Sequence, residues 1–245
     1  MKGSEFAFEE LSIVARGAFT PITLTPAWLS TQELISEDDL QIADVDIVSP
    51  TATVFSIGAF RIQVTPDGMQ IVTPDPAETE RARDLMIGIL RGHPHTPLAV
   101  LGLNRSIHFT PATAQEWHAI GDALAPKGVW EEQEILNLPG IIDVTMQGVR
   151  PDKYSGYVRV KVQPSSKVSS SVFISVNDHF TLTRVNAQPT KREDPPLDSG
   201  EEGGNFTVEK LGVALEILAS EWSSFLQRSE KAIDFVSSLG GGRKK

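Results

Sequence analysis

The sequence predicts an α+β fold built on antiparallel sheets, in which two units of strands are each followed by a helix and a long helix ends the chain. Three observations predict it. Apolar and polar residues alternate over several short runs, helical periodicity follows those runs, and a heptad-like pattern extends over residues 206–239. Segregated strands and helices favour antiparallel sheets over a doubly wound parallel sheet. The repeated order of strands and helix suggests an internal duplication.

The same patterns predict how the chain is organised. The first six residues contain Gly-Ser-Glu-Phe and resemble a cloning remnant. Two units, expected to form a single compact domain, are followed by a segment rich in Pro, Gly and charge that is expected to be flexible. The expected order is unit one at 7–139, an antiparallel meander at 140–185, a flexible loop at 186–205, a helix at 206–239 and a tail at 240–245.

A hairpin and a helix are expected early in unit one. Phe60, Ile62 and Val64 alternate with polar residues, and the Pro-Asp-Gly sequence at 66–68 supplies turn residues. A helix is expected from Asp75, a plausible N-cap that precedes a proline, to about residue 92.

A second strand and helix complete unit one. Residues 98–109 alternate again, which places Asn104 and His108 on the polar face of the strand. A helix capped by Thr113 is expected next. The connector that follows is rich in turn residues, and its Trp130 is expected to be buried.

The second half repeats this pattern with three strands, at about 140–150, 156–165 and 171–184, and then the longest helix. Along that helix apolar residues step by three and four. One interpretation is that residues 206–226 pack across the sheet and that the end of the helix contacts a second copy or another protein. The residues predicted to form this partner interface are Trp222, Phe225, Ala232, Phe235, Val236 and Leu239.

Composition narrows the classes of function. The chain has 245 residues, no cysteine and a net charge of −10, so thiolate metal sites and disulfides are excluded. Residues 1–150 hold 20 acidic and 9 basic residues, and such an acidic chain is unlike most nucleic-acid-binding proteins. We therefore expect no nucleic-acid partner, although Arg150, Lys153, Arg159, Lys161 and Lys167 form a local basic set that keeps this function as an alternative.

The location is expected to be cytoplasmic. The absence of cysteine suits a reducing compartment, and the acidic amino end is unlike a secretory signal. No apolar run approaches the roughly 20 residues that a membrane-spanning helix needs, so we expect no membrane association.

One candidate ligand-binding site is predicted on a polar sheet face. If the strand of His108 adjoins the strand that contains the sequence Asn-Asp-His, their polar side chains share one face, which suits a small anionic or polar ligand. A solvated outer face explains the same pattern. Adjacent strand residues point to opposite faces, so Asp178 is not expected to orient His179. The candidate residues are Asn104, His108, Arg159, Asn177 and His179.

No catalytic, cofactor or metal site is predicted. The common hydrolase, nucleotide and zinc-protease motifs are absent from the sequence. His93 and His95 lie together at a turn, but no carboxylate completes a ligand set with them. The acids at 37–39 lack the pattern of a calcium loop and are interpreted as a solvated charge run.

Four segments in order resemble an uncharacterised family of bacterial proteins of similar length. They are HTPLAVLGLNRSIHF, WHAIGDALAPKGVW, GVRPDKYSGYVRVKVQPS and ISVNDHF, and the resemblance covers about residues 20–185. It implies a bacterial origin and no assigned reaction. We expect a non-enzymatic binding or assembly protein that is a homo-oligomer or a subunit of a larger assembly, with ligand binding or hydrolysis at the polar face as the alternative.

Overall fold

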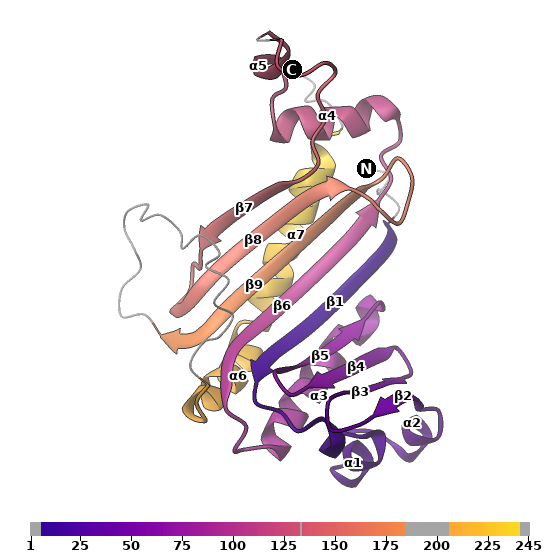
Figure 1. The fold of residues 1–245 in the computed structure, drawn as a ribbon, viewed down its shortest axis with the longest axis vertical. Helices are drawn as coiled ribbons and strands as arrows, with labels where there is room; N and C mark the ends of the chain where they lie inside the picture. Colours follow the sequence, from indigo (N-terminus) through magenta and orange to yellow (C-terminus); the bar gives the residue numbers. More distant parts are fainter. Residues whose placement is uncertain (1–5, 133, 185–205, 241–245) are drawn as a thin grey trace.

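A computed structural model describes residues 6–132, 134–184 and 206–240, and shows one antiparallel sheet of nine strands (Figure 1). The strand order is β2-β3-β4-β5-β1-β6-β9-β8-β7. The strands are β1 (Phe6–Gly17), β2 (Asp44–Val48), β3 (Thr53–Ile57), β4 (Phe60–Thr65), β5 (Gly68–Thr73), β6 (Leu98–Phe109), β7 (Val144–Val149), β8 (Tyr154–Pro164) and β9 (Val172–Arg184).

The described helices follow the order that the sequence predicts, with three short additions, two near the amino end and one in the connector. They are α1 (Pro26–Thr31), α2 (Glu37–Gln41), α3 (Thr79–Gly92), α4 (Ala114–Leu124), α5 (Gly128–Glu132), α6 (Glu209–Ser220) and α7 (Trp222–Ser238), with 3-10 turns at Pro21–Thr23 and Pro76–Glu78. The α+β fold class and the antiparallel sheet are confirmed.

The pairing of β6, from predicted unit one, with β9, from the predicted meander, joins the two units in one sheet. β1 pairs with β5 on one side and with β6 on the other, and β6 also pairs with β9. β1 begins at Phe6, the last of the six residues that resemble a cloning remnant, and this central strand was not predicted. The loop predicted at 186–205 lies outside the described residues, as does the end of the tail.

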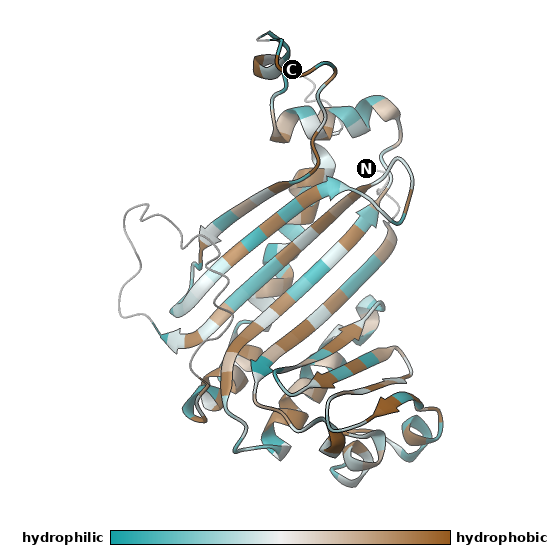
Figure 2. Cartoon of the chain, in the orientation of Figure 1, coloured by the Kyte–Doolittle hydropathy of each residue, from teal (hydrophilic) through white to brown (hydrophobic). Residues whose placement is uncertain are grey.

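The core lies between the sheet and the helices on one of its faces. In Figure 1 α7 runs behind the long strands, and Figure 2 shows the alternation of apolar and polar residues along those strands. Along β9 every second side chain from Val172 to Leu182 is buried. Burial of these apolar side chains drives the association of sheet and helices.

Two predictions, one for the last helix and one for Trp130, are wrong. The helix predicted at 206–239 consists of α6 and α7, which meet at Glu221. Trp130, expected to be buried, is 48% exposed, because the connector around α5 projects beyond the end of the sheet rather than packing on it (Figure 1).

Candidate functional site: the open face of the sheet

The face of the sheet opposite the helices, here called the open face, brings together the five predicted ligand-binding residues. β6 and β9 are neighbours in register, with Asn104 opposite Asn177 and His108 opposite Phe173. On the far side of β9, Arg159 of β8 lies opposite Asn177, and Tyr157 lies opposite His179. The strands of His108 and His179 therefore adjoin, as the prediction of a shared polar face requires.

A polar row crosses five strands in the middle of the open face. The Asn177 side-chain amide donates to Asn104 Oδ1, and Asn104 Nδ2 lies 3.5 Å from the Ser12 carbonyl oxygen. At the other end, Arg159 donates from Nε and Nη2 to Gln147 Oε1, at 3.2 and 2.8 Å. These bonds fix the orientation of a guanidinium and three amides on a surface that is covered by none of the helices in the described part of the chain.

Beside this row, Tyr157 and His179 stack in parallel, with ring centroids 4.3 Å apart and planes at 2°. The Arg159 guanidinium lies 4.7 Å from the centre of the Tyr157 ring, a distance at which cation–π attraction operates. Gly156 makes the register possible. Its φ is +137°, and a Cβ there would lie 1.9 Å from the His179 carbonyl oxygen.

His108 is the one candidate that is buried, with 5% of its surface exposed. Phe8 and Phe173 contact its ring on the open face. Its Nδ1 lies 2.7 Å from Ser165 Oγ, in the turn between β8 and β9. Because Ser165 Oγ accepts the amide N–H of both Lys167 and Val168, the hydroxyl hydrogen is directed at Nδ1.

Burial lowers the pKa of His108, and the positive charge of Lys167 lowers it further, against a smaller opposing effect of Glu10. Its folded pKa thus lies below the unfolded value of about 6.5, so protonation favours unfolding. We expect stability to fall as the pH drops from about 7 through 6.5 and on through the folded pKa, and His108→Asn to reduce that slope in urea unfolding. His95→Asn, which removes a histidine at an exposed position, is the control. An unchanged slope in His108→Asn would contradict this assignment.

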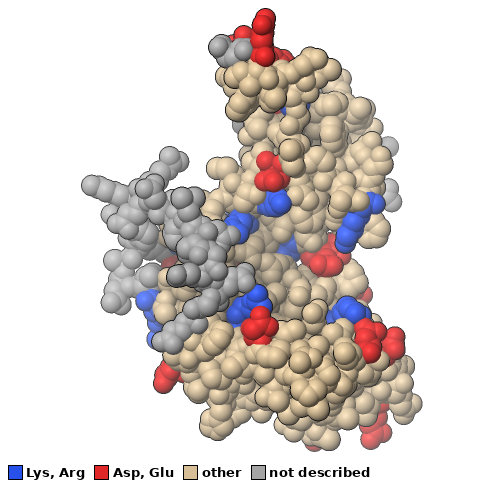
Figure 3. Space-filling model, viewed as in Figure 1, with Lys and Arg blue, Asp and Glu red and all other residues tan. Residues whose placement is uncertain are grey.

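Positive charge dominates one half of the open face. On β6, β7, β8 and β9 its charged side chains are Arg159 and Lys161, and none of its positions on these four strands is acidic. Figure 3 shows basic side chains near the hollow in the middle of this view, with some acidic side chains close to them. In a chain of net charge −10, this half of the face attracts anionic groups.

Asp178 points to the opposite, buried face, as the alternation predicts. It is fully buried and accepts from Arg228 Nη2 at 2.8 Å and from Arg150 Nη2 at 3.4 Å. Arg150 also donates to Asp152 and lies 3.5 Å from the centre of the Phe180 ring. This ion network was not predicted from the sequence, because Arg150, Asp178 and Arg228 lie far apart along the chain and carry no common motif.

The basic set that kept nucleic-acid binding as an alternative does not form one surface. Arg150 is 1% exposed and belongs to the buried network, and Lys153 pairs with Glu216 on α6 at 2.7 Å. Arg159 and Lys161 remain on the open face.

The predicted partner interface on the last helix is corrected by the burial of its side chains. Trp222, Phe225 and Val236 are buried in the chain's own core, where they contact the sheet. Ala232 is half-buried and Leu239 packs against the second core cluster. Of the six residues only Phe235, at 59%, is exposed.

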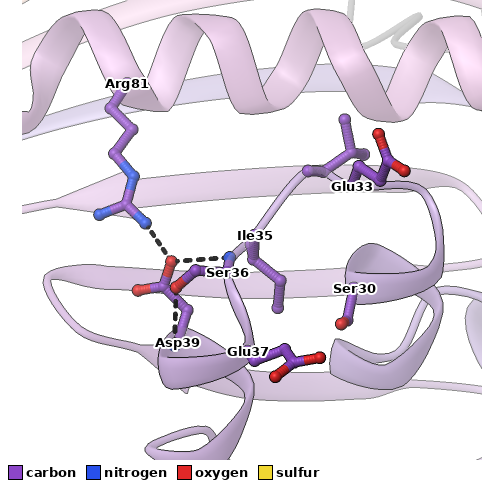
Figure 4. Close-up of a pocket in the computed structure, with 8 residues that line it drawn as sticks. Ser30, Glu33, Ile35, Ser36, Glu37, Asp39 and Arg81 are labelled. Carbon is purple, nitrogen blue, oxygen red and sulfur yellow. Dashed lines mark hydrogen bonds and ion pairs between the residues drawn. The ribbon is translucent and has the colours of Figure 1, made fainter.

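The pocket in Figure 4 lies away from the open face, between the α1–α2 segment and α3, and has a volume of about 510 Å³. Glu37 and Asp39, two of the three acids interpreted as a solvated charge run, line it. Asp39 accepts from Arg81 Nη2 at 2.6 Å and forms a capping box with Ser36. These bonds occupy the carboxylate and assign it to the start of α2.

The crowded histidines are separated. His93 lies at the end of α3, with Nδ1 3.1 Å from the Ile89 carbonyl oxygen and its ring against Trp28, while His108 lies in the sheet. Among the described residues no group of three or more acidic or histidine side chains is placed to hold a metal ion. None of the described helices is long and apolar enough to span a bilayer.

No protein-family model matches the chain, and no curated protein matches it. The resemblance to an uncharacterised bacterial family stays a prediction.

Proposed function

We propose that this chain is a non-enzymatic binding protein, and that a carboxylate-bearing segment of a partner protein lies across its open face. One observation carries the proposal. Five residues from three strands, distant in sequence, meet on a sheet face that none of the described helices covers, and the described positions of β6, β7, β8 and β9 on that face carry cations without an acidic residue.

The shape of the face favours a polypeptide over a small molecule. Small ligands bind in concave pockets that bury most of their surface, whereas the polar row extends over five strands. Side chains such as Asn104, Asn177 and Gln147 are suited to hydrogen bonds with an extended backbone, and Arg159 and Lys161 to pairing with its carboxylates.

Charge favours a protein over a nucleic acid. Nucleic-acid binding depends on many phosphate contacts, and two members of the basic set are engaged elsewhere. Arg159 and Lys161 of the open face are few cations for a ligand that depends on many phosphate contacts, so nucleic-acid binding is the weaker candidate.

Hydrolysis at His108 is also the weaker candidate. Ser165 and His108 have the spacing of a nucleophile and base, but the serine oxygen accepts two backbone N–H groups. Its lone pairs therefore hold the turn, and the phenylalanines on either side of His108 restrict access of a substrate.

We also propose that two units are related by duplication, with the boundary before β6 at residue 98 instead of at residue 139. Each begins with one central strand, β1 or β6, continues through short helices and a meander, and ends with helices. In each, the last meander strand pairs with the first strand of the unit. The order of strands is therefore mirrored about the central β1–β6 pair.

Binding of poly-L-glutamate tests the function. We expect the wild-type chain to bind it at low salt and the double variant Arg159→Gln, Lys161→Gln to bind at least about tenfold more weakly, since each lost ion pair is worth about 1 kcal/mol. Arg61→Gln, which removes an exposed cation of β4, is the matched control. Equal binding by the double variant, or preferential binding of oligo-dT, would contradict the proposal.

A further inference from the structure

β7 is one edge of the sheet, and it lacks the features by which proteins protect edges. Charged side chains and prolines commonly prevent an edge strand from pairing with another chain. The opposite edge, β2, carries Asp44 and Asp46, and Asp46 pairs with Arg61 at 2.7 Å. The sequence of β7, Val-Thr-Met-Gln-Gly-Val, contains neither a charge nor a proline.

Exposed apolar side chains gather on β7 and on the connector that leads into it. Within residues 129–149 they include Leu138 at 86%, Ile142 at 87% and Met146 at 67% exposure. Isolated exposed apolar residues are ordinary, but a continuous run of them marks an interaction surface. The full set is Val129, Trp130, Ile135, Leu136, Leu138, Ile142, Met146 and Val149.

We infer that β7 pairs antiparallel with β7 of a second copy of this chain, and that the apolar connector covers the junction. An uncharged strand is complementary to itself, since a two-fold axis brings no like charges together. A strand of a different, charged partner would leave its charges against Met146 and Val149. The inference is independent of the proposed function.

Strand geometry fixes which residue lies on the two-fold axis. Opposite residues in an antiparallel pair share a face, so a residue of β7 must lie opposite one of the same face. Val144, Met146 and Gly148 point to the helix side, because their partners on β8 are Val162, Val160 and Val158. An axis at Met146 sets the two exposed methionines against each other and places Val144 opposite Gly148 of the second copy.

Axes at the neighbouring residues are less favourable. An axis at Thr145 or Gln147 would put polar side chains at the centre of the junction. An axis at Gln147 would also draw residue 150 into the pairing, and Arg150 is held in the buried network by Asp152 and Asp178. With the axis at Met146, the open faces of the two copies lie on the same side of the joined sheet and form one surface twice as wide.

A cysteine scan tests the inference, because the chain contains no cysteine. Directly opposite Cα atoms in an antiparallel pair lie about 4.5–5.5 Å apart, within the range that a disulfide spans. We expect wild-type chain to be dimeric in native mass spectrometry. Under mild oxidation Met146→Cys should link into dimers at least about tenfold faster than Thr145→Cys or Gln147→Cys. Ile47→Cys, on the other edge, is the control.

A charge variant provides the second measurement. Met146→Lys sets two like charges opposite each other, and we expect it to weaken dimerisation by about tenfold or more, whereas Ile47→Lys should leave the dimer intact. A wild-type monomer, fast linkage of Ile47→Cys, or faster linkage at residue 145 or 147 would overturn the inference.

Discussion

Asp178→Asn is expected to destabilise the fold by about 3–5 kcal/mol, the cost of removing one partner from a buried ion pair. Asp178 is fully buried and is shared by Arg228 and Arg150. Because the asparagine has nearly the same volume, the variant removes the negative charge without opening a cavity. Arg228 would then lose the buried carboxylate to which it donates, and Arg150 would keep only its pairing with Asp152.

Urea unfolding of Asp178→Asn measures this cost, with Asp46→Asn as the control. Asp46 forms an ion pair with Arg61 in which both side chains are about half exposed. Solvent screens such pairs, so the control should lose less than about 1 kcal/mol. Equal losses in the two variants would contradict a structural role for the buried network.

Trp222→Ala is expected to lower the free energy of unfolding by about 3–5 kcal/mol and to leave the oligomeric state of the folded chain unchanged. Trp222 is 1% exposed, contacts Phe225, and donates from Nε1 to Glu80 Oε1 at 2.9 Å. The substitution removes a large ring from the junction of α3, α6 and α7 and leaves a cavity.

The matched control for this variant is Phe235→Ala, on the exposed side of α7. Its loss should stay within about 0.5 kcal/mol, as for most surface substitutions. A Trp222→Ala chain that folds with unchanged stability but changes its copy number would restore Trp222 to the partner interface that the sequence predicted.

Much of the fold follows from the sequence because alternation and capping are local properties. The strand at 98–109, the helix after Thr113 and the meander all appear where their patterns place them. The break at Glu221 does not appear in the pattern, because apolar residues continue at helical spacing through it. The central strand β1 was missed because its start was interpreted as a cloning remnant, although Leu11, Ile13 and Ala15 alternate as strand residues do.

Of the candidate site, the sequence predicts only the face of the strand on which each side chain lies. Alternation assigns His108 and His179 to polar faces, but the pairing of β6 with β9 is a long-range property that joins residues more than 60 positions apart. The contact of His108 with Ser165 and the pairing of Asp178 with Arg228 are also long-range properties, which alternation does not predict. The prediction that Trp130 is buried was wrong for a different reason. Aromatic residues are usually buried, and the sequence does not show that the connector of Trp130 leaves the core.

The five histidines of the chain allow the central claim, that the open face binds a carboxylate-bearing segment, to be tested at a known position. His179 lies on that face beside Tyr157, whereas His95 and His118 are exposed elsewhere. Poly-L-glutamate would be titrated at low salt while the histidine ring signals are followed by NMR. A saturable shift of His179, with His95 and His118 unmoved, is the predicted result. Saturation without a shift of His179, or shifts of His95 or His118 alone, would contradict it.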